Sequence, residues 1–199
     1  MPHIDYYFAT ISPFTYLAGT RMEEVAAKHG ATITYKPLDL PQLFARTGGV
    51  LPKDRHPNRQ EYRLQDLQRA GKWYEMPLNV KPMFWPTNMA PSSYAIIAAQ
   101  RTGEGNLGAL VQAFTRACWA EEKNIAEDEV IRECLTTAGF DPALADADML
   151  ASAEEYGGNL EEAVSRGVFG APFYITETDQ RFWGADKIDQ LDAHLAGKL

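Results

Sequence analysis

The chain has 199 residues, 45% of them hydrophobic, which is enough for one packed core or for one core with a large insertion. Its formal net charge of −8, from 19 basic and 27 acidic residues, argues against nucleic acid as a partner, because no basic stripe is available to neutralise phosphates. No apolar run approaches the roughly 18 residues of a membrane span, and the first residues lack the basic and apolar segments of a secretory signal. We therefore expect neither membrane association nor export.

The N-terminal part of the chain predicts a strand, a helix and a second strand. Apolar and polar residues alternate over 3–9, as in a strand. Ser12 and Pro13 then predict the start of a helix, because serine is a favoured N-cap and proline loses no hydrogen bond at the first helical position. Gly30 is expected to end that helix. Residues 31–38 predict the second strand, which completes a parallel βαβ unit.

The middle of the chain shows no strand pattern between about 40 and 167. Residues 42–57 are rich in Gly and Pro and predict a loop, and a helix is expected from Asn58 to about Lys72. The prolines of 76–91 exclude regular structure there. Further helices are expected at 91–102, 106–120, 127–138, 142–156 and 159–166.

The strand pattern returns only near the C-terminal end. Residues 171–176 and 181–183 predict two strands, and 178–180 have the composition of a hairpin turn between them. A final helix is expected from Asp186 to about Ala196.

This order of elements predicts an α/β, thioredoxin-like fold with a large inserted all-helical domain. Residues 1–40 and 167–199 would form the thioredoxin-like domain, and 41–166 would form the insertion. A thioredoxin-type redox enzyme carries two cysteines in the turn after its first strand. Ser12 and Thr15 occupy those places, so dithiol chemistry is excluded there.

The two cysteines of the chain lie elsewhere. Cys118 and Cys134 are 16 residues apart in helical sequence, which is neither a C-x-x-C motif nor a metal-binding pattern. We expect two buried thiols in a reducing cytoplasm, and no metal site.

Two segments at opposite ends of the chain are candidates for one site. Ser12 would lie among the unpaired N–H groups of a helix N-terminus, a place that favours an anion, although Ser-Pro is also an ordinary helix start. Pro172 is a candidate for a cis peptide bond that leaves the backbone of Ala171 free to pair with an extended peptide. The alternative there is a trans proline at a strand edge.

A third candidate precedes the last helix. The N–H groups of Ala185 and Asp186 are suited to a carboxylate, and the Asp186 side chain is suited to an ammonium group. The simpler alternative is that Asp186 only caps the helix.

These blocks together resemble the 2-hydroxychromene-2-carboxylate isomerase family, which is related to kappa-class glutathione transferases within the DsbA-like branch of the thioredoxin superfamily. The resemblance rests on residues 5–8, 12–18, 35–38, 167–172 and 182–186. It implies a cytoplasmic homodimer that binds glutathione and acts on a small aromatic carboxylate from aromatic compound degradation. The implied reaction is reversible thiolate addition, bond rotation and elimination.

The resemblance also implies roles for the candidate residues. Ser12 contacts the glutathione sulfur and donates a hydrogen bond to it without being the nucleophile itself. The backbone of Ala171, beside Pro172, pairs with the cysteinyl part of the tripeptide. Ala185 and Asp186 hold its γ-glutamyl end.

On the substrate side, Lys36 matches a basic position that faces the substrate carboxylate, and its alternative is a solvated strand lysine. The aromatic residues that are candidates for the wall of the substrate site, or alternatively for core packing, are Tyr6, Tyr7, Phe84, Trp85 and Trp183. The sequence departs from the family in three places. Residues 46–52 lack the asparagine that the isomerases carry and have Gly48-Gly49 instead. Residues 51–57 are more basic and polar than the family leads us to expect, and Ala171 replaces the usual β-branched residue before the late proline.

Three alternatives to the isomerase remain open. The first is a kappa-like glutathione transferase that consumes glutathione by conjugating it to an electrophile. The second is a non-catalytic DsbA-like protein that binds peptides beside Pro172. A disulfide oxidoreductase comes last, because the turn that begins at Ser12 contains no sulfur.

Overall fold

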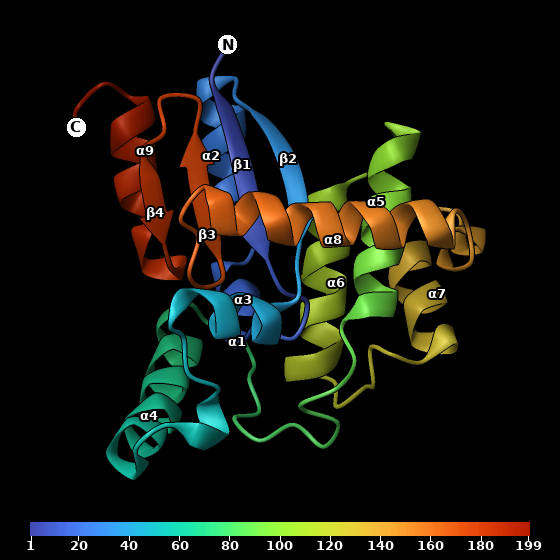
Figure 1. Cartoon of the computed structure of the whole chain (residues 1–199), viewed down its shortest axis with the longest axis horizontal. Helices are drawn as coiled ribbons and strands as arrows, with labels where there is room; N and C mark the ends of the chain where they lie inside the picture. The colour runs from blue at the N-terminus through green and yellow to red at the C-terminus, as the bar shows by residue number, and fades with distance from the viewer.

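A computed structural model describes residues 1–199 and contains one four-stranded sheet and nine α-helices (Figure 1). The strands lie in the order β2-β1-β3-β4, in which β1 and β2 are parallel and the other two pairs are antiparallel. Their bounds are β1 His3–Phe8, β2 Thr32–Pro37, β3 Phe173–Thr176 and β4 Arg181–Trp183. The four predicted strands and the hairpin between the last two are confirmed.

Two helices, rather than the single one predicted, connect β1 to β2. These are α1, Pro13–Ala18, and α2, Arg21–His29. The side chain of Ser12 caps α1 as expected, and Gly30 ends α2 with a φ of 62°. The prediction of one continuous helix was wrong because Gly19 adopts a φ of 60° and ends α1 after six residues.

The chain between the second and third strands is helical throughout its regular parts. Its helices are α3 Leu40–Thr47, α4 Pro57–Trp73, α5 Ala90–Thr102, α6 Leu107–Trp119, α7 Asp128–Thr137 and α8 Met149–Ser165, with short 3₁₀ turns at Pro52–Asp54 and Pro142–Ala145. None of the helices combines the length and the apolar character that a membrane span requires.

Three predictions in this region were wrong. A helix was expected from residue 142, but Pro142–Ala145 form a 3₁₀ turn and α8 begins only at Met149, after Asp148 with a φ of 48°. Residues 42–57 were expected to be a loop, but α3 occupies 42–47 because Asp39 accepts a hydrogen bond from Gln42 N at 3.0 Å and caps the helix. A break was expected between 156 and 159, but α8 runs through Gly157 and Gly158. Its buried residues on either side of the pair, Tyr156 and Asn159, fix the helix by packing.

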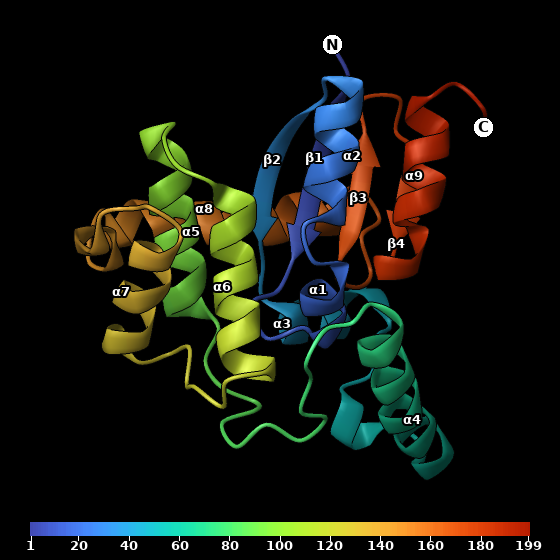
Figure 2. The same cartoon turned by 180° about the vertical axis from the view of Figure 1, so that it is seen from behind.

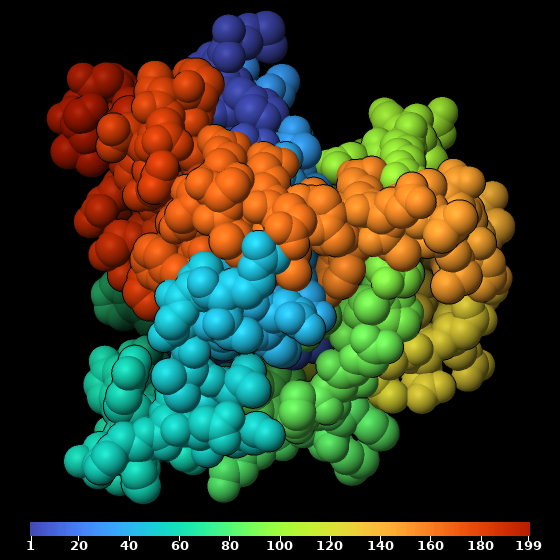
Figure 3. All heavy atoms as spheres, in the orientation of Figure 1, coloured from blue at the N-terminus to red at the C-terminus, as the bar shows by residue number.

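The two faces of the sheet are covered by different helices (Figures 1 and 2). Ile4, Tyr6 and Phe8 point into the larger core cluster, together with residues of α1, α2, α5, α6 and α9 (Ile188–Leu195). Tyr7 points to the other face, where α3 and α8 pack. Figure 3 shows α8 lying across that face.

The larger core cluster contains residues of the sheet and of α5, α6 and α7 alike. The predicted thioredoxin-like fold is therefore present, with one core shared by the sheet and by helices that follow β2. The division at residues 40 and 167 into two domains stays a prediction.

The last helix begins slightly later than predicted. A 3₁₀ turn, Ala185–Lys187, precedes α9, whose N-cap position is Lys187. The expectation that Asp186 caps this helix was wrong. Its carboxylate accepts from Lys187 Nζ at 3.1 Å instead, because the intervening turn moves residue 186 out of the cap position.

Candidate functional site

Ser12 lies between the end of β1 and the start of α1, with only 3% of its surface exposed. Its hydroxyl donates to Ala171 O at 3.3 Å and accepts from Thr15 N at 3.2 Å. Hydroxyl hydrogen bonds are commonly about 2.7–2.8 Å long, so the bond to Ala171 is weak. The Ser12 proton is therefore available to a stronger acceptor.

The segment around Pro172 is brought directly beside Ser12. The Ala171–Pro172 peptide bond is cis, which confirms that prediction. Pro172 O accepts from Gly184 N at 3.0 Å, whereas the N–H of Ala171 has no partner within the protein. The N–H of Phe14, in the first turn of α1, is also unpaired. Two backbone donors are thus free near the Ser12 hydroxyl.

Thr15, in the place of a second cysteine, is 1% exposed, and its Oγ1 has no hydrogen-bond partner. An orphaned buried hydroxyl is uncommon in a native fold. Neither Ser12 nor Thr15 carries sulfur, and the two thiols of the chain are buried in the helical part, as predicted. Burial raises the pKa of both Cys118 and Cys134 to about 12, so neither supplies a thiolate at neutral pH.

A groove of about 750 Å³ runs from the start of α1 to the turn before α9. Its wall includes Phe14 and Leu17 of α1, Tyr62 of α4, and the predicted pair Ala185 and Asp186. The structure therefore brings that pair and the start of α1 to the same groove.

Two tryptophans hold the residue that precedes Ser12. Trp85 Nε1 donates to Ile11 O at 3.0 Å, and Trp119 Nε1 donates to the same oxygen at 3.3 Å. The two rings lie 5.6 Å apart between centroids. Of the aromatic residues predicted for the site, Trp85 therefore lies next to the Ser12 turn.

The other predicted aromatic residues are distributed differently. Trp183 is 52% exposed and packs edge-on against Phe169 at 4.9 Å, beside the loop that contains Ala171. Tyr6 is 2% exposed, and its ring stacks on Tyr174 at 5.1 Å in the core. Its contacts are those of the alternative, core packing. Phe84 is 42% exposed.

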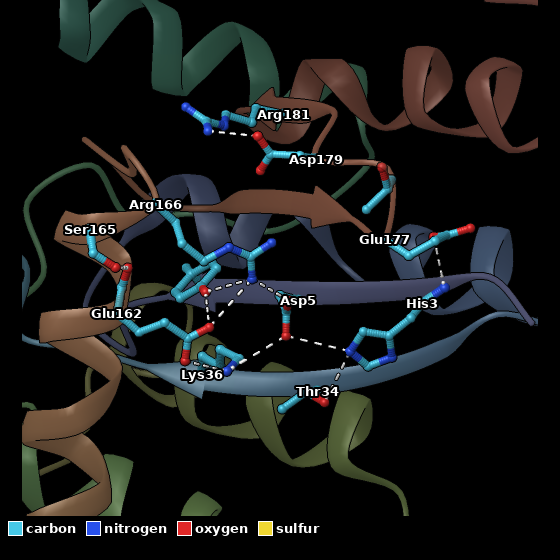
Figure 4. Close-up of polar contacts among 12 residues, drawn as sticks. His3, Asp5, Thr34, Lys36, Glu162, Ser165, Arg166, Glu177, Asp179 and Arg181 are labelled. Atoms are coloured by element: carbon cyan, nitrogen blue, oxygen red, sulfur yellow. Dashed lines mark hydrogen bonds and ion pairs between the residues drawn. The ribbon is translucent and has the colours of Figure 1, made fainter.

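Lys36 takes part in an ion-pair network beneath α8 (Figure 4). Its ammonium group lies 2.6 Å from Glu162 Oε2 and 3.6 Å from Asp5 Oδ1. Arg166 contacts both carboxylates, and Tyr7 Oη donates to Glu162 at 2.7 Å. The charge of Lys36 is therefore satisfied inside the protein, on the sheet face that α8 covers.

The neighbouring cations lower the pKa values of Asp5 and Glu162 by more than burial raises them. Burial raises the pKa of Asp5, but the hydrogen bond from Arg166 and the charge of Lys36 bring it below its ordinary value. For Glu162, burial again raises the pKa, and the hydrogen bonds from Lys36 and Tyr7 lower it on balance. Both groups are carboxylates at neutral pH.

The loop that lacks the family asparagine has a steric explanation. Gly49 follows α3, and a Cβ atom at that position would overlap the ring of Phe44. An asparagine at residue 49 therefore requires Phe44 to move.

Sequence reasoning missed Arg63, a half-buried residue of α4. Its Cζ atom lies 5.1 Å from the ring centroid of Trp85 and 5.9 Å from that of Trp119. Burial, and the nearby charge of Arg55, lower the pKa of Arg63 to about 10. The signal that pointed to this region was the basic character of the segment before α4.

A family model and two related proteins match nearly the whole chain. The DSBA-like thioredoxin domain matches residues 3–196. A 2-hydroxychromene-2-carboxylate isomerase of Sphingobium xenophagum is 32% identical over 96% of this chain and 97% of its own length. Glutathione S-transferase kappa 1 of Caenorhabditis elegans is 26% identical over 94% of this chain and 88% of its own.

Solved structures share the fold. A structure of 2-hydroxychromene-2-carboxylate isomerase superposes with a TM-score of 0.76 at 25% identity, covering 98% of this chain and 95% of the other. The cytosolic disulfide reductase DsbM of Pseudomonas aeruginosa, solved with GSH, superposes with a TM-score of 0.70 at 16% identity, covering 98% of each chain.

Proposed function

The chain belongs to the DsbA-like thioredoxin family and, within it, to the 2-hydroxychromene-2-carboxylate isomerases, and from this premise we propose that it is a glutathione-dependent isomerase. Its substrate would be 2-hydroxychromene-2-carboxylate or a related intermediate of aromatic degradation. The observation that carries the proposal is the Ser12 hydroxyl, which stands in place of a reactive cysteine and is held only by long hydrogen bonds. We extend the same proposal to a cytoplasmic homodimer.

The residues around Ser12 fit a bound glutathione. The unpaired N–H of Ala171 is suited to the peptide backbone of the tripeptide, as in strand pairing. Ala185 and Asp186, on the wall of the groove, would hold the γ-glutamyl end, with the carboxylate of Asp186 near its ammonium group. The kappa-class relative and the DsbM structure with GSH support this choice of cofactor.

When bound, glutathione would supply a thiolate able to add reversibly to a conjugated carbon of the opened substrate and so allow rotation about the former double bond. Ser12 would favour the thiolate by donating a hydrogen bond to it. Lowering a thiol pKa from about 8.5 by about two units requires about 2.7 kcal/mol. A hydrogen bond to a charged group supplies about 1.5–3 kcal/mol.

The helix makes a smaller contribution than the sequence led us to expect, because α1 has only six residues. The unpaired N–H of Phe14 is the local donor that this helix adds. Ser12 itself has no base beside it: its partners are the Ala171 carbonyl and the Thr15 N–H. A role as hydrogen-bond donor is therefore favoured over a role as nucleophile.

Trp85 and Trp183 are the aromatic residues that we propose for the substrate side, since both lie beside the Ser12–Ala171 contact. The roles predicted for Lys36 and Tyr6 stay predictions, and their contacts in the structure give them no support.

The test has two steps. Calorimetric titration with glutathione should give one binding event per chain. A spectrophotometric assay on 2-hydroxychromene-2-carboxylate should then show isomerisation that requires glutathione and leaves its concentration unchanged. Depletion of glutathione would establish the transferase instead, and binding without turnover of any electrophile would establish the non-catalytic binding protein.

A further inference from the structure

One segment of this acidic chain carries cations without carboxylate partners. Between residues 53 and 63, which we call the basic segment, no ion pair is formed by Lys53, Arg55, Arg59 or Arg63. Elsewhere most lysine and arginine side chains lie within 4 Å of a carboxylate. The segment projects with α4 from the rest of the molecule (Figure 1).

Arg63 is the member of the basic segment that two tryptophans link to the Ser12 turn. Its guanidinium group lies over the rings of Trp85 and Trp119. The indole N–H groups of the same two rings hold the carbonyl of Ile11, the residue before Ser12. One pair of aromatic rings thus ties the position of Arg63 to that of the Ser12 turn.

The environment of Arg63 is unfavourable for a cation in the free protein. The side chain is half-buried, and none of its N–H groups donates a hydrogen bond to the protein. Partial burial disfavours the charge, stacking on the aromatic rings offsets a part of that effect, and the N–H groups stay accessible to a ligand. The charge of Arg55 adds repulsion. Because its pKa stays near 10, Arg63 is a cation at neutral pH.

We propose that Arg63 binds the carboxylate of the organic acid that reacts at the Ser12 site. A guanidinium group accepts a carboxylate through two parallel N–H···O bonds, which fixes orientation as well as position. Arg63 would thus select acids over neutral aromatic compounds, a role for which Lys36 is not available because Glu162 and Asp5 occupy its ammonium group. The assignment rests on the proposed isomerase function, since it names part of the substrate.

A binding experiment tests the subsite without requiring turnover. The full chain, saturated with glutathione, is titrated with trans-cinnamate and with cinnamamide, and tryptophan fluorescence reports on binding. We expect cinnamate to bind at least about tenfold more tightly than the amide. Arg63→Leu should weaken cinnamate binding by about 10- to 100-fold and leave amide binding unchanged. Arg63→Lys keeps the charge but loses the paired N–H donors of the guanidinium group. Its affinity for cinnamate should lie between those of the wild-type protein and Arg63→Leu.

Arg59→Leu is the matched control, because Arg59 lies one turn earlier in α4 and is exposed. It should change cinnamate binding by less than twofold. An equal loss in Arg59→Leu and Arg63→Leu would mean a diffuse positive field, and would overturn the subsite. Failure of the wild-type protein to prefer cinnamate over its amide would overturn it as well.

A second titration identifies the source of the carboxylate. Glutathione should bind Arg63→Leu within twofold of its affinity for the wild-type protein. Weakened glutathione binding with unchanged cinnamate binding would assign the arginine to the tripeptide and overturn the proposal. These equilibria are measured apart from the isomerase assay, so that failure of the isomerase proposal and failure of the subsite are distinguishable.

Discussion

Two regions of the molecule place lysine and arginine side chains in opposite environments. Beneath α8, Lys36 and Arg166 face Asp5 and Glu162, and each of the four has an oppositely charged partner (Figure 4). In the basic segment, Arg63 faces two aromatic rings and no carboxylate. The difference indicates that the supply of neighbouring carboxylates, more than the cation itself, decides whether a charge stabilises the fold or stays available to a ligand.

The origin of the partners explains this difference. Glu162 comes from α8 and meets Lys36 across 126 residues of chain, and both groups are fixed by the packing of α8 on the sheet. No helix brings a carboxylate against the cations of the basic segment in this way. Variants in the network beneath α8 should therefore change stability, and variants in the basic segment should change ligand binding.

The largest effect is expected at Ser12. Ser12→Ala should lower the rate of isomerisation by about 100-fold or more, because it removes the donor that we assign to the thiolate. The variant should also unfold more easily by about 1 kcal/mol, since Ser12 caps α1. Ser12→Thr, which keeps a hydroxyl group, is the matched control. Steady-state kinetics with saturating glutathione measure the effect, and an unchanged rate in Ser12→Ala would rule out this role.

The next effect is one of stability. Glu162→Ala should lower the free energy of unfolding by about 1–2 kcal/mol, because Lys36, Tyr7 and Arg166 all lose an acceptor. The adjacent Glu161→Ala removes an exposed surface pair with Arg46, and its loss of stability should be clearly smaller because water screens that pair. Urea unfolding of the two variants measures the difference. Equal losses would contradict the structural role of the network.

Local sequence signals were sufficient for the four strands and for the first turn. The alternation in β1, the Ser-Pro cap and the proline before β3 depend on neighbouring residues only, and each was predicted correctly. The helices were harder. Gly19 ends α1 within a segment of otherwise helical residues, whereas Gly157 and Gly158 do not interrupt α8 because packing on β2 and α5 stabilises it.

Long-range contacts explain what the sequence did not reveal about the site. Lys36 and Arg63 are both basic residues in otherwise unremarkable positions of a strand and a helix. Their different environments depend on Glu162, Trp85 and Trp119, which reach them only after folding. Side-chain charge alone therefore could not rank the two as carboxylate ligands.

A third prediction compares these two cations directly. Lys36→Met should destabilise the fold by about 1 kcal/mol through loss of its bond to Glu162, while the KM for the carboxylate substrate changes by less than twofold. The Arg63→Leu variant is its counterpart, with the larger change in KM. Urea unfolding and steady-state kinetics on both proteins provide the measurement. A large rise of KM in Lys36→Met would restore the substrate role that the sequence suggested.

The smallest effect expected is in the pH dependence of stability. The pKa values of Asp5 and Glu162 are lowered in the folded protein, whereas in the unfolded chain such groups titrate near about 3.9 and 4.3. Below about pH 5 the unfolded state therefore binds more protons, and the stabilisation from both groups, fully present above that pH, is lost as the pH falls toward their folded values.

Urea unfolding between about pH 6.5 and 3.5 should show this loss in the wild-type protein and a shallower loss in Asp5→Asn, which has one such carboxylate fewer. Arg63→Leu should follow the wild-type slope, because its guanidinium contacts two indole rings and no acid. If Asp5→Asn kept the wild-type slope while Arg63→Leu flattened it, the acid-sensitive charges would lie in the basic segment, and the contrast between the two regions would be reversed.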